Sequence, residues 1–406
     1  MTSSQSGDTV GLISAPGADQ VRGNRIAIGS AITLGTICAL VANTLPVFLV
    51  VLGRTLSLGE AQVGYVALAD LGGIAIGSII CAILPALLAR LGWRHVAMAG
   101  IALLISGNIL ASQAGSFSIL LASRSLAGAG AGFTMAIAYA VLAGGNHPAR
   151  NLALFNVSQL ASAAIGVQFL GTIADVWGAQ GLFLLISAIS VLAAGLCYLL
   201  PRAGRDERSE SLSNNAPANP DRISGPGWVA IIAALLHFIG TGAIFGFLAY
   251  MGISWGGDPA TVEASLSTVM LAAIAGAVIA AIVGARFHFL RPLIVGYAIL
   301  LSAIVLLFVV QPVEHFVFFA SLFGFGWNIV MPFQFAAVTH ADRSDSAAML
   351  VNASTLGGVA IGPAIAGNFV TRDYGVIITG SFGALILALA LLLLALKWNG
   401  PVAPAK

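Results

Sequence analysis

Two charged residues lie deep inside apolar stretches of the sequence. Asp70 is the only charged residue of the stretch 62–88, and Arg124 is the only charged residue of the stretch 118–142. A buried carboxyl group can bind and release a proton, whereas an arginine keeps its charge and can only pair or bind. These residue types suit proton coupling, with Asp70 as the titrating group and Arg124 as its partner or as a contact for an anionic or electron-rich solute. They equally suit a structural ion pair, or an arginine that extends to a polar surface.

A single histidine, His237, lies near the middle of another apolar stretch, 228–251. Histidine ordinarily titrates near pH 6.5, which suits a residue that handles protons. A lone histidine is equally typical of a side chain that is hydrogen-bonded to a neighbouring helix. Cys38, Cys81 and Cys197 lie far apart in the sequence, so no metal-binding spacing is visible and no cofactor is expected.

Uncharged polar and aromatic side chains recur in the apolar stretches and suit contact with a small solute. Aromatic faces with a few amide groups bind partly apolar or aromatic molecules. Besides Arg124, the candidate binding residues are Asn43, Gln159, Phe245, Tyr250, Trp327, Asn328 and Gln334. Aromatic residues in apolar helices are also common as packing residues, which leaves a second role open for each of them.

The composition indicates where these side chains must lie. Of the 406 residues, 59% are hydrophobic and only 8% are charged, whereas about 25% of residues in a soluble domain are charged. We therefore expect an all-α integral membrane protein surrounded by lipid. A helix of about 20 apolar residues spans the hydrocarbon core. Twelve stretches fit: 26–53, 62–88, 95–114, 118–142, 152–174, 181–200, 228–251, 263–285, 292–310, 315–338, 347–370 and 376–397.

The basic residues predict the orientation of these helices, because they favour the cytoplasmic side. If the N-terminus is cytoplasmic, all arginines and lysines of the loops and tails except Arg54 and Arg372 lie on the cytoplasmic side. We predict that both termini are cytoplasmic and that the protein lies in the inner (plasma) membrane. The net charge of +2 reflects this topology, so no nucleic-acid partner is expected. The expected divisions are a tail at 1–25, a six-helix bundle at 26–201, a polar cytoplasmic linker at 202–226, a second six-helix bundle at 227–398 and a tail at 399–406.

Asp70 and Arg124 fall at similar depths in this topology. They lie about eight and about six residues from the outer ends of their helices, or roughly 12 and 9 Å. A lone ion at the bilayer centre costs about 2.5–3.5 kcal/mol, and pairing lowers that cost. We therefore predict that Asp70 and Arg124 interact, directly or through water.

The two bundles repeat one another in sequence. At an offset of about 196 residues, four separate segments align without gaps. The clearest match pairs NVSQLASAAIGVQFLG (156–171) with NASTLGGVAIGPAIAG (352–367). In this repeat Ala320 stands opposite Arg124, so the arginine is a feature of one half, and Trp327 and Asn328 replace small residues of the other half.

A duplicated six-plus-six helical membrane protein with a central linker resembles the major facilitator superfamily. The stretch PALLARLGWR (85–94) is similar to the family loop G-x-x-x-D-R-x-G-R-R, although Pro85 and Ala89 replace its Gly and Asp. The Arg and Gly-rich run of the family's fourth helix is matched by Arg124, Gly128, Gly130 and Gly132. The element GPAIAG (362–367) is similar to one of the drug–proton antiporter branch, where it lies in the fifth helix; here it lies in the eleventh.

The resemblance implies two six-helix bundles that alternate access to a central site, with gates at either side. Candidate gating residues are Arg90 and Arg94 in the loop, and Asn156 and Asn352, which recur in both halves near cytoplasmic helix ends. The arginines have a second explanation as topology signals, because the loop lacks its Asp.

The sequence thus predicts a monomeric, non-enzymatic secondary transporter for a small organic solute, a metabolite or a drug-like compound. No nucleotide-binding motif is present, so the proton gradient is the expected driving force, and import or export stays open. The alternatives are a proton-independent facilitator, an organic-anion exchanger that uses Arg124, and, more remotely, a transporter-like receptor. A membrane-embedded enzyme would need a second deep catalytic or metal-binding residue beside His237.

Overall fold

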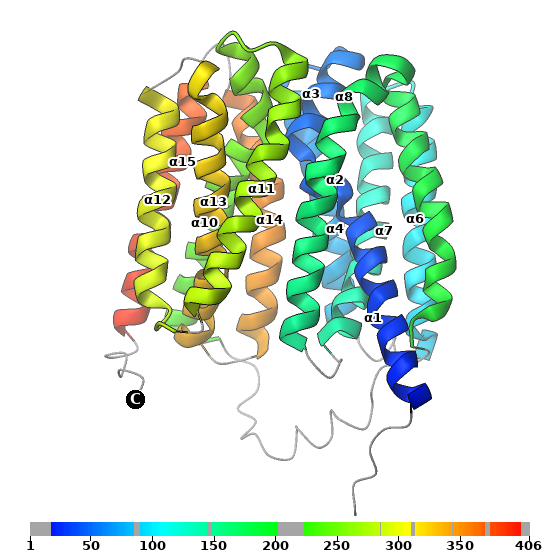
Figure 1. The fold of residues 1–406 in the computed structure, drawn as a ribbon, viewed down its shortest axis with the longest axis horizontal. Coiled ribbons are helices and arrows are strands. Elements are labelled where there is room, and N and C mark those ends of the chain that lie inside the picture. Colours follow the sequence, from blue (N-terminus) through cyan, green and yellow to red (C-terminus); the bar gives the residue numbers. More distant parts are fainter. Residues whose placement is uncertain are drawn as a thin grey trace, which may run out of the picture.

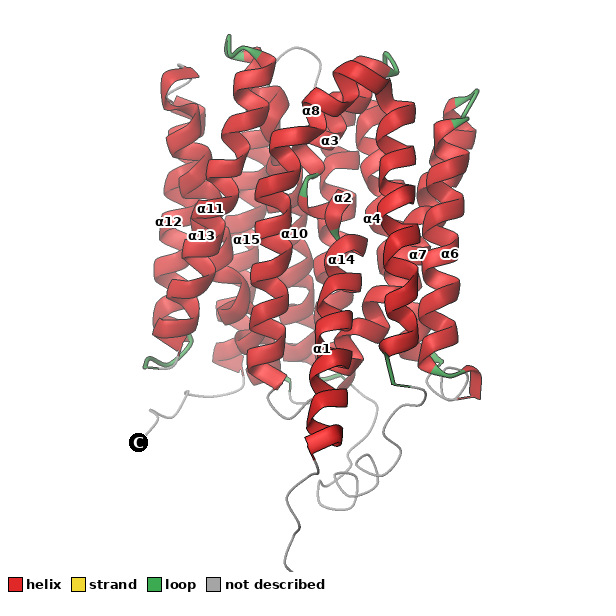
Figure 2. Cartoon of the chain, turned by 45° about the vertical axis from the view of Figure 1, so that its right-hand side comes forward, coloured by secondary structure: helices red, strands yellow, loops and turns green. Residues whose placement is uncertain are grey.

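The computed structural model describes residues 18–84, 90–143, 148–201, 223–284, 286–309, 313–342, 345–369 and 374–398. Within these ranges every regular element is a helix (Figure 2). Apolar side chains from nearly all of the helices form one continuous buried cluster. The all-helical membrane architecture predicted from the composition is confirmed.

The N-terminal half contains the elements up to residue 200. They are α1 (Ala18–Cys38), α2 (Leu40–Asn43), α3 (Leu45–Thr55), α4 (Glu60–Ile83), α6 (Trp93–Ser112), α7 (Phe117–Ala143), α8 (Pro148–Ala194) and the short 3-10 helix η1 (Gly195–Leu199). Gly178 interrupts α8 with a φ of 64°, a left-handed conformation that favours glycine. This bend separates two predicted segments, 152–174 and 181–200.

The C-terminal half repeats this order. It contains α10 (Gly225–Ser254), α11 (Pro259–Gly284), α12 (Leu290–Val309), α13 (Val313–Ala341), α14 (Asp345–Phe369) and α15 (Gly375–Trp398). Shifting α6, α7 and α8 by about 196 residues brings their first residues within one residue of the starts of α12, α13 and α14. The helices therefore follow the sequence repeat.

Nine helices of the described chain are long and apolar enough to cross a membrane. α8 is one of these and contains two of the twelve predicted segments. Two predicted segments are not matched by any of these nine helices. The segment 347–370 corresponds to α14, and the segment 26–53 corresponds to α1, α2 and α3. The helix positions therefore agree with the twelve-segment prediction, and the first segment differs in one respect.

The first predicted segment, 26–53, is not one continuous helix. It is divided at Ala39 and Thr44 into α1, α2 and α3. Pro46 lies in the first turn of α3, a position that favours proline because the backbone N–H that it lacks would have no partner within the helix there. The Leu40 carbonyl accepts hydrogen bonds from both the Thr44 hydroxyl at 2.8 Å and the Thr44 backbone N–H at 3.0 Å, and these close the last turn before the break. Asn43 is the last residue of α2 and lies directly before the break at Thr44.

The bundle has two ends, which we name by their residues. At the basic end α1 begins and α15 ends (Figure 1), and this end carries Arg25, Arg90, Arg94, Arg286, Arg291 and Lys397. At the distal end lie the connections 56–59, 113–116 and 255–258. Both described termini therefore lie at one end, as an even number of crossings requires.

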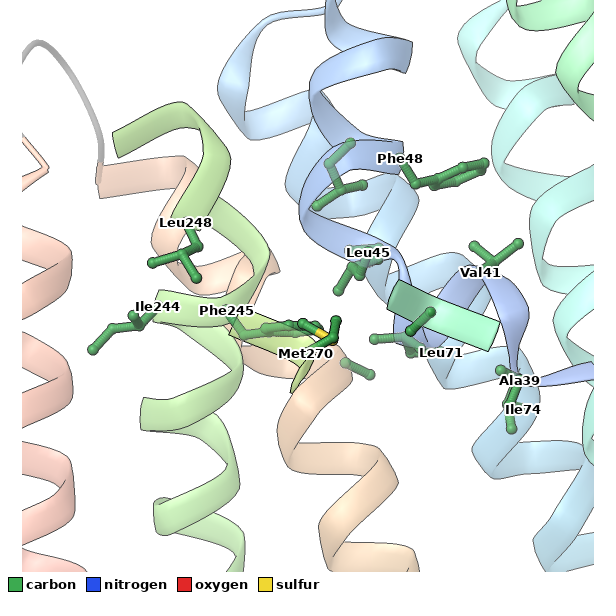
Figure 3. Packing of buried hydrophobic residues seen from close by; sticks show 14 of the residues in the cluster. Ala39, Val41, Leu45, Phe48, Leu71, Ile74, Ile244, Phe245, Leu248 and Met270 are labelled. Atoms are coloured by element: carbon green, nitrogen blue, oxygen red, sulfur yellow. The ribbon is translucent and has the colours of Figure 1, made fainter. Parts of the chain in front are cut away.

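The two halves meet through three helix pairs: α4 with α14, α8 with α11, and α3 with α10. Figure 3 shows part of this contact, where Phe245 of α10 and Met270 of α11 are directed toward Leu45 and Leu71 of the other half. The space that these pairs enclose is where a site between the halves must lie.

Candidate functional site

A cavity of about 210 Å³ lies between the two halves at the centre of the bundle. Residues of both halves form its wall, including the broken first segment and helices α4, α7 and α8 on one side and α10, α11, α13 and α14 on the other. A second cavity of about 660 Å³ adjoins it and shares Tyr139, Asn156, Gln159, Asn328 and Met331 with it. The two form one path from the centre of the protein.

This path leads to the basic end. The second cavity is lined by Leu152 near the start of α8 and by Gly284 at the end of α11. It also reaches Phe287 and Phe289 in the connection between α11 and α12. A solute in the central cavity therefore has a route toward the basic end.

At the distal end the halves are joined by hydrogen bonds that we call the distal gate. In this gate Tyr250 Oη donates to Leu49 O (3.1 Å), Tyr374 Oη donates to Glu60 Oε1 (2.7 Å), Tyr65 Oη donates to Asn368 Oδ1 (3.1 Å), and Gln168 Nε2 donates to Ser267 Oγ. Backbones also approach closely there, since a Cβ on Gly64 of α4 would collide with the Pro363 carbonyl of α14. The protein is thus closed at its distal end.

The wall of the central cavity combines aromatic rings, thioethers and amides. The Trp327 ring packs edge-on against Phe245, with 5.3 Å between the ring centroids, and lies beside Phe323. Three methionines, Met135, Met270 and Met331, add flexible apolar surface that can adapt to different shapes. No charged residue of the described chain lines either cavity.

The amide and hydroxyl groups of the central cavity are those of Asn43, Tyr139, Asn156, Gln159, Asn328 and Thr355. Asn43 Nδ2 donates to Gln159 Oε1 at 3.2 Å, which joins α2 to α8 at the wall. Asn328 Nδ2 donates to the Gly324 carbonyl at 3.0 Å, which fixes the side chain on α13. Its Oδ1 then remains available as an acceptor toward the cavity.

Five of the predicted binding residues therefore lie together in the cavity wall: Asn43, Gln159, Phe245, Trp327 and Asn328. Asn156, predicted as a gating residue, lines both cavities. Tyr139, the three methionines and Thr355 were not singled out from the sequence. Of these, only Tyr139 has a sequence feature that could have indicated a binding role, because it is a tyrosine in an otherwise apolar part of α7. Like Asn156, it lines both cavities.

The predicted contact between Asp70 and Arg124 is confirmed. Arg124 Nη2 donates to both carboxylate oxygens of Asp70 at 2.8 Å, and Nη1 donates to Asn108 Oδ1 at 2.7 Å. The guanidinium carbon lies 5.4 and 5.2 Å from the ring centres of Phe48 and Phe183. Asp70 is 3% exposed and Arg124 is fully buried. We call Asp70, Asn108 and Arg124 the charged triad; it ties α4, α6 and α7 together.

The charged triad lies inside the N-terminal half and outside the cavity wall. Leu71 and Ile74 of α4 line the central cavity, whereas Asp70 turns toward α7. The expectation that Arg124 contacts the solute therefore does not agree with the cavity that the structure contains. The physical reason is rotation about the helix axes, because both terminal nitrogens of the guanidinium donate to Asp70 and Asn108, and the described cavity wall offers it no acidic partner.

Gln334 and His237 also lie away from the cavity. Gln334 Oε1 accepts from the Tyr297 hydroxyl at 2.7 Å, and both residues are fully buried within the C-terminal half. The His237 ring packs edge-on against Phe238 and Tyr297, and its two nitrogens have no hydrogen-bond partner among the described residues. Among the described residues, its ring contacts are with Phe238 and Tyr297, and no acid or base is paired with it to exchange a proton. The structure thus favours a packing role for His237.

We predict that His237→Leu, which keeps about the same volume, leaves transport and its pH dependence unchanged. Volume-conserving apolar substitutions cost less than about 1.5 kcal/mol in a core, and the ring nitrogens lose no partner. The measurement compares the initial rate of solute uptake into liposomes from pH 5 to 8 for the variant and the parent protein. A lost or shifted pH profile in well-folded protein would show that the histidine handles protons.

The remaining predicted residues lie at the two ends. Tyr250 belongs to the distal gate and does not line the central cavity. Arg94 Nε donates to the Leu200 carbonyl within the N-terminal half, and Arg90 is exposed to solvent. Neither arginine bridges the halves through a described ion pair. The side chain of Asn352 lies outside the described part of the structure, although its backbone belongs to α14.

Comparisons with known proteins agree with this architecture. The family model described as Major Facilitator Superfamily matches residues 32–347. Among solved structures, a mutant of the nucleoside transporter NupG aligns with a TM-score of 0.70 at 12% identity, covering 92% of this chain and 100% of that one. A bacterial homologue of the human lysosomal transporter Spinster, inward-facing and occupied, aligns with a TM-score of 0.69 at 17% identity, covering 96% of this chain and 100% of that one.

The same Spinster homologue in an inward-facing, unoccupied state aligns with a TM-score of 0.66 at 14% identity, covering 94% of this chain and 99% of that one. No curated protein matches the sequence. At these identities the structural matches establish the fold, and the family model covers more than half of the chain. The protein is a multi-pass membrane transporter and not an enzyme, and it belongs to the Major Facilitator Superfamily.

Proposed function

We propose that this protein is a secondary transporter that carries a small, uncharged organic solute with an apolar or aromatic face. The two halves rock about the central cavity and expose it to each side of the membrane in turn. The observation that carries the proposal is the cavity itself. It lies between the halves, is lined by aromatic, thioether and amide groups, and extends to the basic end while the distal gate is closed.

The basic end is the cytoplasmic side in this proposal, because arginine and lysine favour that side of a membrane. The structure then corresponds to an inward-facing state of a monomer in the inner (plasma) membrane. The shape of the path supports this assignment of the state. The second cavity connects the centre with Phe287 and Phe289 at the basic end.

The absence of charge among the described lining residues supports an uncharged solute. A carboxylate or an ammonium group in such a cavity would lose its hydration without gaining a counterion. This argues against an organic-anion exchanger that uses Arg124, because that guanidinium is fully buried against Asp70 and Asn108. A nucleoside has the required chemistry, with a flat ring and several neutral hydrogen-bonding groups, and it is the substrate class named for NupG.

Proton-coupled transport with Asp70 as the proton carrier is the finer form of this proposal. Asp70 is a buried carboxyl group held 2.8 Å from Arg124, in the helix that also presents Leu71 and Ile74 to the cavity. Protonation would release Arg124 and shift α4 against α7, so the coupling would act through helix position. The alternative is a facilitator in which the charged triad is structural.

The test uses the purified protein in liposomes with an imposed pH gradient of either sign. Labelled nucleosides, aromatic acids, sugars and cationic drugs are offered separately. We expect an uncharged aromatic solute to be transported and the charged compounds to be excluded. Accumulation whose direction reverses with the gradient would support proton coupling, whereas flux that ignores the gradient would support the facilitator. Transport of the charged compounds alone would contradict the proposed solute class.

We predict that Asn328→Leu raises the KM of the transported solute about tenfold and changes kcat little. The substitution removes an amide from the cavity wall, and one lost hydrogen bond costs about 1.4 kcal/mol, or a factor of ten. The measurement is the concentration dependence of uptake. Gln113→Leu, at an exposed distal turn outside the cavity, is the control and should match the parent. An unchanged KM for Asn328→Leu would remove this residue from the site.

A further inference from the structure

Glu263 is a buried acid that the proposed transport path does not use. It lies in the first turns of α11 at the distal end and is 4% exposed. Its Oε1 has no hydrogen-bond partner among the described residues. The nearest cation is Arg54 of α3, whose Nη1 lies 4.0 Å from Oε1. A carboxylate in this position has lost most of its hydration, and the distant contact with Arg54 replaces only a small part of it.

The charges around Glu263 do not compensate for that loss. Arg54 makes its short contact with Asp175 of α8, at 2.6 Å, and those side chains are 41% and 62% exposed. The charged groups that act on the Glu263 carboxyl are Arg54, Asp175 and Asp258, and thus one cation and two further acids. Arg54 is shared with Asp175, and the negative charges of Asp175 and Asp258 disfavour a further negative charge on Glu263.

Glu263 is covered by the other half of the protein. A Cβ on Gly171 of α8 would collide with Glu263 Oε2, so the carboxyl group lies directly against that helix. One turn further along α11, Ser267 accepts the distal-gate hydrogen bond from Gln168 of α8. The contact that buries Glu263 is therefore part of the contact that closes the distal end, and separating α8 from α11 would return the carboxyl group to water.

We propose that Glu263 is a proton-binding residue of the distal gate, protonated when the gate closes and ionised when it opens. The inference rests on the alternating access of the proposed function. Closing the gate strips water from a carboxylate that has no full counterion, which is costly unless a proton neutralises it. The proton comes from the solution at the distal side and returns there on opening. Acid at the distal side then favours the inward-facing state.

The experiment measures gate opening directly. Leu56→Cys and Ala260→Cys place spin labels at exposed distal positions of opposite halves, and the native cysteines are buried. The inter-label distance distribution is recorded from pH 5 to 8 in lipid nanodiscs without solute. We expect the ratio of open to closed gates to rise with pH, by up to about tenfold per pH unit for one coupled proton.

Glu263→Gln mimics the neutral acid and should give the closed distance at every pH. Asp258→Asn is the matched control, five residues earlier in the chain and still able to cap the helix. Hydrogen bonds from the backbone and hydroxyl of Thr261 lower the pKa of Asp258, so it stays ionised above pH 5. Its replacement should keep the pH dependence and move its midpoint only slightly, to lower pH, because one acid that opposes the Glu263 charge is lost. Arg54→Gln, which retains Glu263, should move the midpoint to higher pH because the one stabilising cation is lost.

Three results would overturn the inference. They are a distance that does not change with pH in the parent protein, an unchanged pH dependence in Glu263→Gln, and an open gate at every pH in Glu263→Gln. The last would show that attraction to Arg54 holds the gate closed. Because no solute is present, failure to find a transported compound does not affect these results. Conversely, pH-independent gating in a protein that transports would refute the inference alone.

Discussion

Replacing Asp70 by asparagine is expected to destabilise the protein by about 3 kcal/mol, the lower end of the cost of breaking a buried ion pair from one side. The reason is that Arg124 is fully buried, so its charge would lose its counterion without gaining water. Asn108 and the rings of Phe48 and Phe183 would remain as partners but carry no negative charge. The measurement is the free energy of unfolding in mixed micelles, or the midpoint of thermal denaturation followed by tryptophan fluorescence.

Asp175→Asn is the control for this prediction. It removes an acid from an ion pair with Arg54 that is exposed to solvent, and such pairs contribute about 0–1 kcal/mol. A double variant, Asp70→Asn with Arg124→Gln, removes both buried charges and should regain much of the lost stability.

The same variants separate the two roles of the charged triad. A structural pair predicts that the double variant also regains transport. If Asp70→Asn is instead as stable as the parent but loses gradient-driven accumulation while exchange persists, then Asp70 carries the proton. Equal stability with unchanged accumulation would contradict both roles.

A valine at Gly64 is expected to lower solute uptake by at least tenfold, a loss of about 1.4 kcal/mol or more in the inward-facing state. Gly64 of α4 lies against the backbone of α14, and any Cβ there would collide with the Pro363 carbonyl. Neither backbone can yield without separating the two halves. The side chain should therefore hold the distal gate open, so that solute can bind from that side but cannot be released at the basic end.

Gly72→Val is the matched control, because it makes the same change on the same helix. A Cβ on Gly72 would contact only the end of the Leu68 side chain, at 3.9 Å. The measurements are uptake into liposomes and the distance between labels at positions 56 and 260. A closed distal gate with normal uptake in Gly64→Val would show that the contact between α4 and α14 does not control access.

The fold and the partnership of Asp70 with Arg124 could be predicted from the sequence, for related reasons. Helix length is set by the membrane, so apolar stretches indicate both the helices and the depth of each residue along them. Two opposite charges at the same depth in neighbouring helices are expected to pair, because pairing lowers the cost of burying each charge. The depth of a residue along its helix could therefore be predicted from the sequence, and this depth was sufficient to predict the contact between Asp70 and Arg124.

Rotation about the helix axis could not be predicted in the same way. Gln334 and Asn328 lie in the same helix, yet Asn328 faces the cavity and Gln334 faces Tyr297 inside the C-terminal half. Every face of these helices is apolar, because lipid and protein core select the same side chains, so no amphipathic pattern marks the inner face. The break at Thr44 was equally hidden, since Pro46 signals a kink but not the short helix α2 before it.

The charged triad has a mechanical consequence for the transport cycle. By joining α4, α6 and α7 through charged hydrogen bonds within the distal half of the bundle, it makes three helices of the N-terminal half a single stiff body. The other half has Ala320 at the position equivalent to Arg124, so the arginine of this brace has no counterpart there. We therefore expect the N-terminal half to move more nearly as one rigid body, and bending during turnover to concentrate in the C-terminal half.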